Sequence, residues 1–232
     1  PEKQHQYWGY FPLRGKILNV RNATVKQLAT NEEIKMIMKI VGLKEKVDYS
    51  LPGAPPLRYG KILVLADADD DGHHIKALLM NFIYHYWPSL AKKEGFICDM
   101  ATPICKAIKR DARDKIIKAQ EFYNLSEAKT WATANPASGW TMKYYKGLGT
   151  YNPQEAKELC KSMQMTNYFF DETSHDKFIL AFAKKEEDAR KDWLNNGIEP
   201  QPYSLANSKT VSYADFIDNR LKIFSMADNV RS

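Results

Sequence analysis

The hydrophobic positions between residues 58 and 88 predict a buried strand followed by an amphipathic helix. The run Ile62 to Ala66 is apolar at every position, as in a parallel strand buried on both faces. From Ile75 to Tyr86, apolar residues recur at i, i+3, i+4, i+7, i+8 and i+11, and Pro88 helps to end this helix. An acidic cluster joins the two elements. It should therefore lie at the carboxyl end of the strand, where open α/β sheets bind ligands.

The rest of the pattern extends this unit into an α/β domain over residues 1–170, followed by a helical connector over residues 171–232. We expect a mostly parallel sheet flanked by helices, with a C-terminal helical extension. A polar linker is expected at residues 197–209. The other expected elements are short strands at 17–20, 97–108, 115–123 and 140–145, one or two helices at 24–41 with an interruption at Asn31, helices at 126–133, 153–163 and 174–195, and a short helix after residue 213.

Composition limits the class of protein. The chain has 232 residues, 44% hydrophobic and 27% charged, which favours a globular fold over a disordered one. It contains no apolar stretch of about 18 residues and no visible export signal, so a soluble, intracellular protein is expected, with no membrane partner. Three scattered cysteines argue against a disulfide framework or a zinc site. The net charge of +6 favours a polyanionic partner, although many enzymes are equally basic.

The acidic cluster, Asp67-Ala-Asp-Asp-Asp-Gly-His-His74, carries the strongest chemical signal. If the chain leaves the strand extended, Asp67, Asp69 and Asp71 face one side. Carboxylates that close raise one another's pKa unless a cation compensates them. Mg²⁺ is the preferred ion, because it takes one or two protein carboxylates and leaves positions for substrate phosphates.

Two other interpretations of the cluster remain, and a calcium loop is excluded. The aspartates could be solvated turn residues, with Asp71 capping the following helix. A calcium-binding EF-hand loop begins in the same way, but its twelfth position requires Glu and is Leu78 here. A phosphohydrolase of the haloacid-dehalogenase type would use Asp67 as nucleophile, although Asp71 stands where that pattern has Thr or Val.

Basic and glycine-rich segments supply candidate phosphate contacts. Pro12 and Gly15 frame a basic turn. The segment Tyr144-Tyr-Lys-Gly-Leu-Gly-Thr150 offers a lysine that could neutralise phosphate and glycines that let the backbone approach a ligand, although a strand ending in a turn is an equal alternative. His73 and His74 begin the amphipathic helix, where anions are favoured, yet a solvent-facing histidine pair is as plausible.

These segments together resemble the type IIA DNA topoisomerases, specifically the toprim region of their DNA cleavage core, in the form found in eukaryotes and large DNA viruses. The resemblance covers nearly the whole chain in family order. The matching phrases are Pro12-Leu-Arg-Gly-Lys-Ile-Leu-Asn-Val20, Arg58-Tyr-Gly-Lys61, Asp67-x-Asp-x-Asp-Gly72 with His74-Ile-Lys76, Thr102-Pro-Ile104, Tyr144-Tyr-Lys-Gly-Leu-Gly-Thr150 and Asp188-x-Arg-Lys-x-Trp-Leu194.

The resemblance implies a toprim (Rossmann-like) fold and an isomerase that cleaves and religates duplex DNA during ATP-dependent strand passage. ATP would bind outside this chain, and the full-length enzyme would be a homodimer. It would act in the nucleus of a cell, or in the host cytoplasm or nucleus if viral. The implied site residues are Asp67, Asp69 and Asp71 for Mg²⁺, and Arg14, Lys16, His74, Lys146 and Gly147 for DNA.

Two parts of the family pattern are missing from this sequence. The first is the toprim glutamate of an E-G-D-S-A phrase upstream of Pro12. The second is a catalytic nucleophile. Tyr59 follows an arginine, as the family's nucleophilic tyrosine does, but it lies eight residues before Asp67, about 26 Å away on an extended strand, and is therefore too far from the acids. The attacking tyrosine is expected beyond Ser232, so the chain alone should be inactive. A non-catalytic DNA-binding or assembly module remains the alternative.

Overall fold

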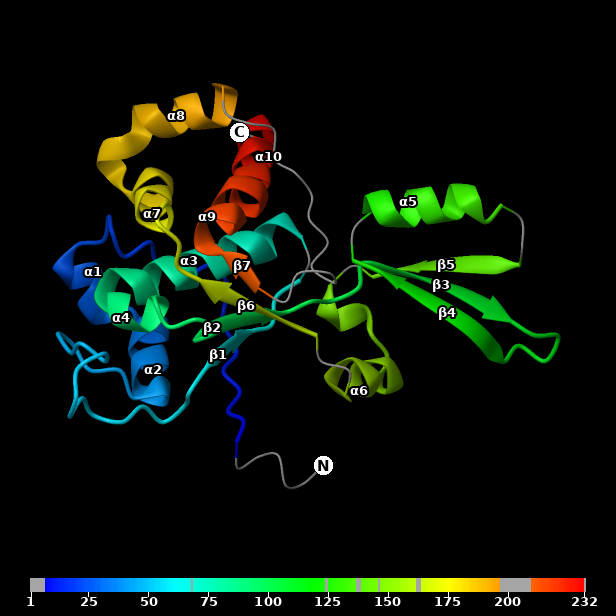
Figure 1. Ribbon diagram of the computed structural model, residues 1–232, viewed down its shortest axis with the longest axis horizontal. Coiled ribbons are helices and arrows are strands. Elements are labelled where there is room, and N and C mark those ends of the chain that lie inside the picture. The colour runs from blue at the N-terminus through cyan, green and yellow to red at the C-terminus, as the bar shows by residue number, and fades with distance from the viewer. Residues whose placement is uncertain are drawn as a thin grey trace.

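A four-stranded mixed sheet organises the larger part of the molecule (Figure 1). The computed structural model describes residues 7–67, 69–123, 125–136, 139–145, 147–161, 164–196 and 210–231. The strand order is β1-β2-β6-β7, with β1 parallel to β2, β2 antiparallel to β6, and β6 parallel to β7. The α/β class and the mostly parallel sheet are therefore confirmed. The strands are β1 (Ile62–Val64), β2 (Ile97–Met100), β6 (Met165–Phe169) and β7 (Thr210–Ser212).

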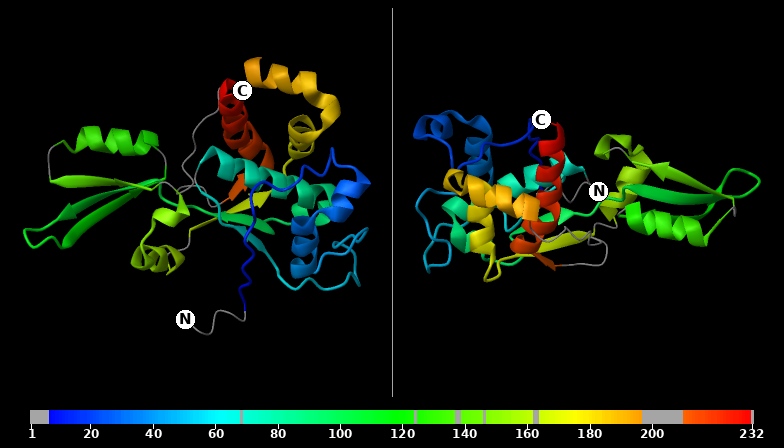
Figure 2. Two further views of the ribbon diagram at one scale, coloured as in Figure 1. Left: turned by 180° about the vertical axis from the view of Figure 1, so that it is seen from behind. Right: turned by 90° about the horizontal axis from the view of Figure 1, so that it is seen from above.

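Helices cover this sheet, and the long helix α3 (Asp70–Tyr86) is the most deeply buried of them (Figures 1 and 2). Phe82 and Ile83 of α3 are fully buried, which confirms the helical pattern seen in the sequence. The other helical segments that flank this sheet are α1 (Val25–Thr30), α2 (Glu32–Val41), α4 (Pro88–Ala91), α7 (Ser174–Phe182), the 3₁₀ turn η3 (Lys184–Glu186), α8 (Glu187–Asn196), α9 (Tyr213–Phe216), the π-helical turn η4 (Ile217–Leu221) and α10 (Lys222–Arg231).

A second, antiparallel sheet projects away from the first, on the right in Figure 1. Its order is β4-β3-β5, with β3 (Cys105–Arg110), β4 (Ile116–Phe122) and β5 (Trp140–Tyr144). Helix α5 (Leu125–Ala134) packs on one face, where Phe122 and Trp131 help to form a small separate core. The 3₁₀ turn η2 (Leu148–Thr150) and α6 (Pro153–Lys161) lie at the base.

One buried ion pair crosses the main core between α3 and β2. Lys76 Nζ lies 2.6 Å from Asp99 Oδ2, both side chains are at most 2% exposed, and the Tyr168 hydroxyl donates to the same oxygen at 3.1 Å. Removing one partner of such a pair would leave an uncompensated buried charge, which is strongly destabilising. The pair therefore joins α3 to β2 inside the core.

Several expected elements differ in detail from those observed. Residues 17–20 form no strand; Ile17 and Val20 are instead buried in the core from an irregular segment. The helix expected over 174–195 is broken, because Ala183 is extended (φ −79°, ψ 134°). The interruption expected at Asn31 is confirmed, since its side chain accepts a hydrogen bond from Ile34 N and caps α2.

The C-terminal part of the chain joins the main sheet rather than only extending from it. Strand β7 pairs with β6, and η4 and α10 pack against α3. One buried cluster contains Val64 and Phe82 together with Phe216 and Phe224. The expected boundary between a domain over residues 1–170 and a helical connector over residues 171–232 stays a prediction. The expected linker at residues 197–209 lies outside the described residues.

Candidate functional site: a carboxylate cavity beside the start of α3

The parallel strands β1 and β2 end at the same cavity. The chain leaves β1 into Asp67, and it leaves β2 toward Thr102 and Pro103. All three residues line a cavity of about 310 Å³. Such a cavity at the carboxyl ends of parallel strands is the usual ligand position in an α/β sheet. Its other lining residues are Asp69, Ile104, Tyr145, Gly147 and Tyr151.

Asp69 has a structural role in addition to facing the cavity. Its backbone is extended (φ −102°, ψ 177°), and its Oδ1 accepts a 2.8 Å hydrogen bond from Gly72 N, which caps α3. A Cβ at Gly72 would overlap the carbonyl oxygen of Asp67, so only glycine allows this close approach. The sequence therefore places the helix start directly against the end of β1.

The glycine-rich turn lies against the acidic cluster. Gly147 has a positive φ of 88°, and a Cβ built on it would overlap the carboxylate of Asp67. Thr150 closes the turn by donating from its hydroxyl to the carbonyl of Gly147 at 2.7 Å. Two candidates that are 80 residues apart in sequence are thus brought together.

Two tyrosines line the same cavity as the acids. The rings of Tyr145 and Tyr151 stack with centroids 4.2 Å apart. The Tyr151 hydroxyl donates to Pro103 O at 2.7 Å, and the Tyr145 hydroxyl donates to Glu155 at 3.1 Å. Burial, together with nearby carboxylates, raises the pKa of both phenols. Both side chains are therefore neutral wall residues near pH 7, and neither is an activated nucleophile.

Asp71 does not continue the extended run. The expectation of three carboxylates on one side of an extended chain is wrong, because helix α3 already begins at Asp70. Asp71 instead forms an ion pair with Lys16, with 2.9 Å between Nζ and Oδ1. Over the described ranges, no three His, Cys, Asp or Glu side chains are grouped closely enough to hold a metal. The interpretation of Asp71 as the helix cap is also wrong, since Asp69 fills that role.

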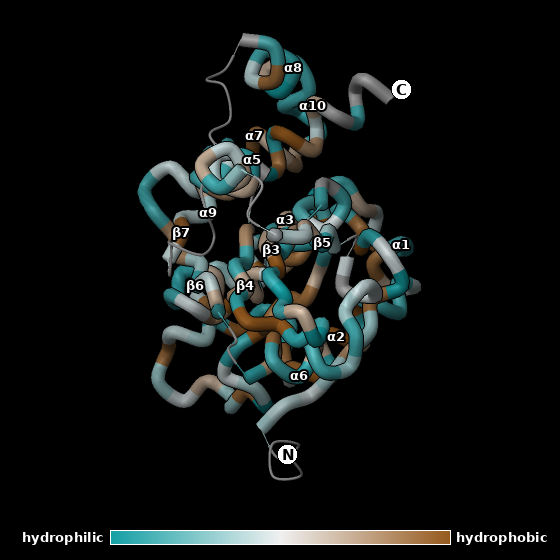
Figure 3. The backbone as a smooth tube through the Cα atoms, turned by 90° about the vertical axis from the view of Figure 1, so that its right-hand side faces the viewer, coloured by the Kyte–Doolittle hydropathy of each residue, from teal (hydrophilic) through white to brown (hydrophobic). Residues whose placement is uncertain are grey.

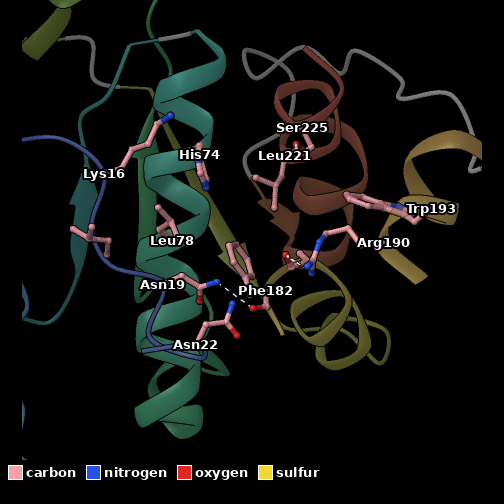
Figure 4. Close-up of a pocket in the computed structure, with 12 residues that line it drawn as sticks. Lys16, Asn19, Asn22, His74, Leu78, Phe182, Arg190, Trp193, Leu221 and Ser225 are labelled. Atoms are coloured by element: carbon pink, nitrogen blue, oxygen red, sulfur yellow. Dashed lines mark hydrogen bonds between the residues drawn. The ribbon is translucent and has the colours of Figure 1, made fainter. Parts of the chain in front are cut away.

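Lys16 and His74 lie in a second cavity, of about 390 Å³, between α3 and the C-terminal helices (Figure 4). The His74 ring packs on Phe224 with centroids 4.2 Å apart, and Lys16 Nζ lies 4.9 Å from the centre of the same ring. Burial, with a smaller effect of Lys16, lowers the pKa of His74 to about 4, so the imidazole is neutral at pH 7. Neither His73 nor His74 is a freely solvated surface side chain.

The other residues considered from the sequence either do not line the carboxylate cavity or lie outside the described residues. Arg14 is exposed beside Gly15, which has a positive φ of 118°. Lys146 lies outside the described residues. Tyr59 is not in the carboxylate cavity; its hydroxyl is close to Gly9. The sequence interpretation missed Thr102, Tyr145 and Tyr151 as wall residues, although each lies within or next to a segment that carried the resemblance.

The donor set of the carboxylate cavity fits Mg²⁺. Asp67 and Asp69 line one cavity, and the helix cap engages Oδ1 of Asp69. Mg²⁺ commonly takes one or two protein carboxylates and fills its other positions with water and phosphate. The number and kind of ligands are therefore suitable.

This combination of fold and site defines a protein of the toprim type. The family model described as the C-terminal associated domain of TOPRIM matches residues 100–229, more than half of the chain, and the chain therefore belongs to this family. DNA topoisomerase 2-alpha from Homo sapiens is 42% identical over 97% of this chain and 15% of its own length. DNA topoisomerase 2 from Acanthamoeba polyphaga mimivirus is 39% identical over 97% of this chain and 22% of its own length.

A solved structure gives the same answer for the fold. The DNA-binding, cleavage and re-ligation domain of Plasmodium falciparum topoisomerase II superposes with a TM-score of 0.85 at 36% identity, covering 96% of this chain and 30% of that one. The resemblance to type IIA topoisomerases is confirmed. The chain spans only about 15–22% of the length of the curated relatives named above.

Proposed function

We propose that this chain is the Mg²⁺-binding toprim portion of a type IIA DNA topoisomerase. The whole protein would cleave and religate duplex DNA for ATP-dependent strand passage, with ATP and the nucleophilic tyrosine supplied outside this chain. The observation that carries the proposal is the shared cavity of Asp67, Asp69 and Gly147 at the ends of β1 and β2. Alone, the chain would neither cut DNA nor hydrolyse ATP.

Asp67 and Asp69 would hold the metal, and Asp71 would become a third ligand if it leaves Lys16. A bound Mg²⁺ would supply Lewis-acid stabilisation to a DNA phosphodiester. The side chains of this chain would then orient the phosphate: the stacked tyrosines wall the cavity, and Gly147 lets the backbone approach closely. Because their phenols are neutral, Tyr145 and Tyr151 add no charge that would compete with the phosphate.

DNA would be held by the basic residues around this cavity. Arg14 and Lys16 are both exposed, and the ion pair between Lys16 and Asp71 joins the basic turn to the acidic cluster. Gly147 lines the same cavity, and Lys146 would add a further cation for the DNA backbone. His74, being neutral, would contribute a hydrogen bond rather than a charge. Phosphate contacts of this kind position a duplex without selecting its sequence.

The remaining partners follow from the same proposal. They are duplex DNA, the other domains of the polypeptide, and a second copy in a homodimer, acting in the nucleus of a cell or in an infected host cell. Across the described residues, no helix combines the length and apolar character needed to cross a bilayer.

The test is a full-length relative in which this chain replaces the corresponding region. We expect the chimera to relax supercoiled DNA, and Asp67→Asn to reduce relaxation by at least about 100-fold, since it removes a metal ligand. Binding of duplex DNA without metal should change by less than about twofold, because Asn keeps the shape of the side chain. Relaxation by Asp67→Asn at the rate of the parent chimera would contradict the proposal.

A further inference from the structure

The projecting sheet presents a free edge at β4. Among the described residues, β4 pairs only with β3, so its other edge has no neighbouring strand. Ile116 and Ile117 on this strand are 47% and 52% exposed, and they lie at a β-bulge, where the register against β3 shifts between Lys109 and Arg110. Helix α5 packs against the sheet through Trp131, which contacts Phe122 and Trp140, and residues 116–121 of β4 remain exposed. Figure 3 views the molecule from the side on which this sheet projects.

The same hairpin is strongly basic. Residues 106–118 contain six Lys or Arg and only two Asp, in a chain whose whole net charge is +6. Lys106 pairs with Glu121 at 3.2 Å, and Arg110 lies 3.6 Å from Asp114. In the described part of the chain, the side chains of Arg113, Lys115 and Lys118 form no ion pair. A row of uncompensated cations therefore flanks the two isoleucines.

Hydrogen bonds hold the hairpin tip in one conformation. Asp111 accepts from the backbone N–H groups of Arg113 and Lys115 at 2.9 and 3.0 Å, and Arg110 donates to the carbonyl of Asp114 at 2.7 Å. A short turn fixed in this way orders the start of β4 before any partner arrives. Preorganisation of this kind lowers the entropic cost of binding.

We propose that the β4 edge binds an extended, acidic segment of a partner protein as an additional antiparallel or parallel strand. Main-chain hydrogen bonds would supply the pairing, and the two exposed isoleucines would contact apolar side chains of the partner at the start of β4. Lys115 and Lys118 would select acidic neighbours and repel a second copy of the same strand. The apolar pair distinguishes this surface from a purely electrostatic DNA contact, which needs cations but not isoleucines.

The probe is a fluorescent, end-blocked peptide of alternating valine and glutamate, as long as β4. Binding is measured by anisotropy on the full chain, and the contacted amides are located by NMR. We expect saturable binding, with shift changes and new protection from hydrogen exchange confined to β4 and the hairpin tip. The same peptide with all its internal backbone nitrogens methylated should bind at least about tenfold more weakly, because it cannot donate main-chain hydrogen bonds along either edge.

A charge-reversal variant tests the selection of acidic partners. Lys115→Glu with Lys118→Glu should weaken binding of the peptide by at least about tenfold. The matched control is Lys26→Glu with Lys39→Glu, two exposed lysines on α1 and α2, and it should change affinity by less than about twofold. Far-UV circular dichroism checks that both variants fold, as expected for substitutions at exposed positions.

Several results would overturn the proposal. Equal binding of the methylated peptide would show that no strand is added. Equal loss of affinity in the control variant would show a general charge effect. A short duplex oligonucleotide that binds the same amides more tightly than the peptide would make the hairpin a nucleic-acid surface instead. Because these results concern β4 alone, they are distinguishable from any result at Asp67 and Asp69.

Discussion

The two cavities beside the start of α3 differ in how their charged side chains are used. In the carboxylate cavity, Asp67 and Asp69 face a space walled by neutral tyrosines. In the second cavity, Arg190 donates from Nη1 to the carbonyls of Leu180, Ala181 and Ala183 at 2.8 to 3.2 Å, so its charge serves the end of α7. Charge alone therefore does not indicate a ligand site. The carboxylate cavity is the better candidate because it combines charged oxygens with a close glycine backbone.

Lys16 connects the two cavities, so they are not independent of each other. It lines the second cavity and at the same time pairs with Asp71 of the acidic cluster. Both side chains are partly exposed, at 43% and 59%, so the pair contributes little to stability. If Lys16 binds DNA as proposed above, a change at Asp71 would alter the charge that this lysine offers to the DNA.

The largest expected effect on stability is at Gly72. Gly72→Ala places a Cβ against the backbone of Asp67, which cannot move without displacing the end of β1. We expect a loss of about 2–4 kcal/mol in the free energy of unfolding, measured by denaturant titration. Gly149→Ala is the matched control, because a Cβ there meets nothing within 4 Å. Equal stability of the two variants would mean that α3 does not start against Asp67.

A smaller effect separates the two roles of Asp69. Asn caps helices as well as Asp does, so Asp69→Asn should keep the stability of the parent within about 0.5 kcal/mol, while Asp69→Ala should lose about 1 kcal/mol. Both substitutions should weaken Mg²⁺ binding, because both remove the carboxylate. If only Asp69→Ala weakened metal binding, the capping role would account for the whole effect and Asp69 would not be a ligand.

The smallest effect concerns the basic turn. Lys16→Gln should lower the dependence of DNA affinity on salt by about one unit of the log–log slope, equally for all sequences. Asp71→Asn should act in the opposite direction, because it releases Lys16 from its ion pair. Lys26→Gln on α1 provides the control for a lysine outside both cavities. An unchanged slope in Lys16→Gln would place this lysine away from the DNA backbone.

The sequence was most informative where a signal is local. The apolar spacing from Ile75 to Tyr86 predicted α3, and the Asn31 interruption predicted two helices, since both depend on neighbouring residues. The start of α3 at Asp70 was missed because Asp70, Asp71 and Gly72 carry no apolar periodicity. As a result, Asp71 was predicted on one face of an extended segment, whereas it lies in the first turn of α3.

Nonlocal features could not be predicted in the same way. Strands β6 and β7 were not expected, because β7 has only three residues and both are defined by pairing across the sheet. The contact between Gly147 and Asp67 joins segments 80 residues apart, so no window of sequence contains it. The aromatic wall was missed for the same reason, since Tyr145 and Tyr151 gain their position from Glu155 and Pro103.

The most direct test of the account is a titration of Mg²⁺ into the chain, followed by calorimetry and by amide NMR. We predict that the chain folds without metal and binds Mg²⁺ with a Kd on the order of millimolar, as for a site that keeps several waters. Shift changes should occur at Asp67, Asp69 and Gly147, and both Asp67→Asn and Asp69→Asn should remove them. Shift changes located elsewhere, or binding that both variants retain, would contradict the assignment of the metal to this cavity.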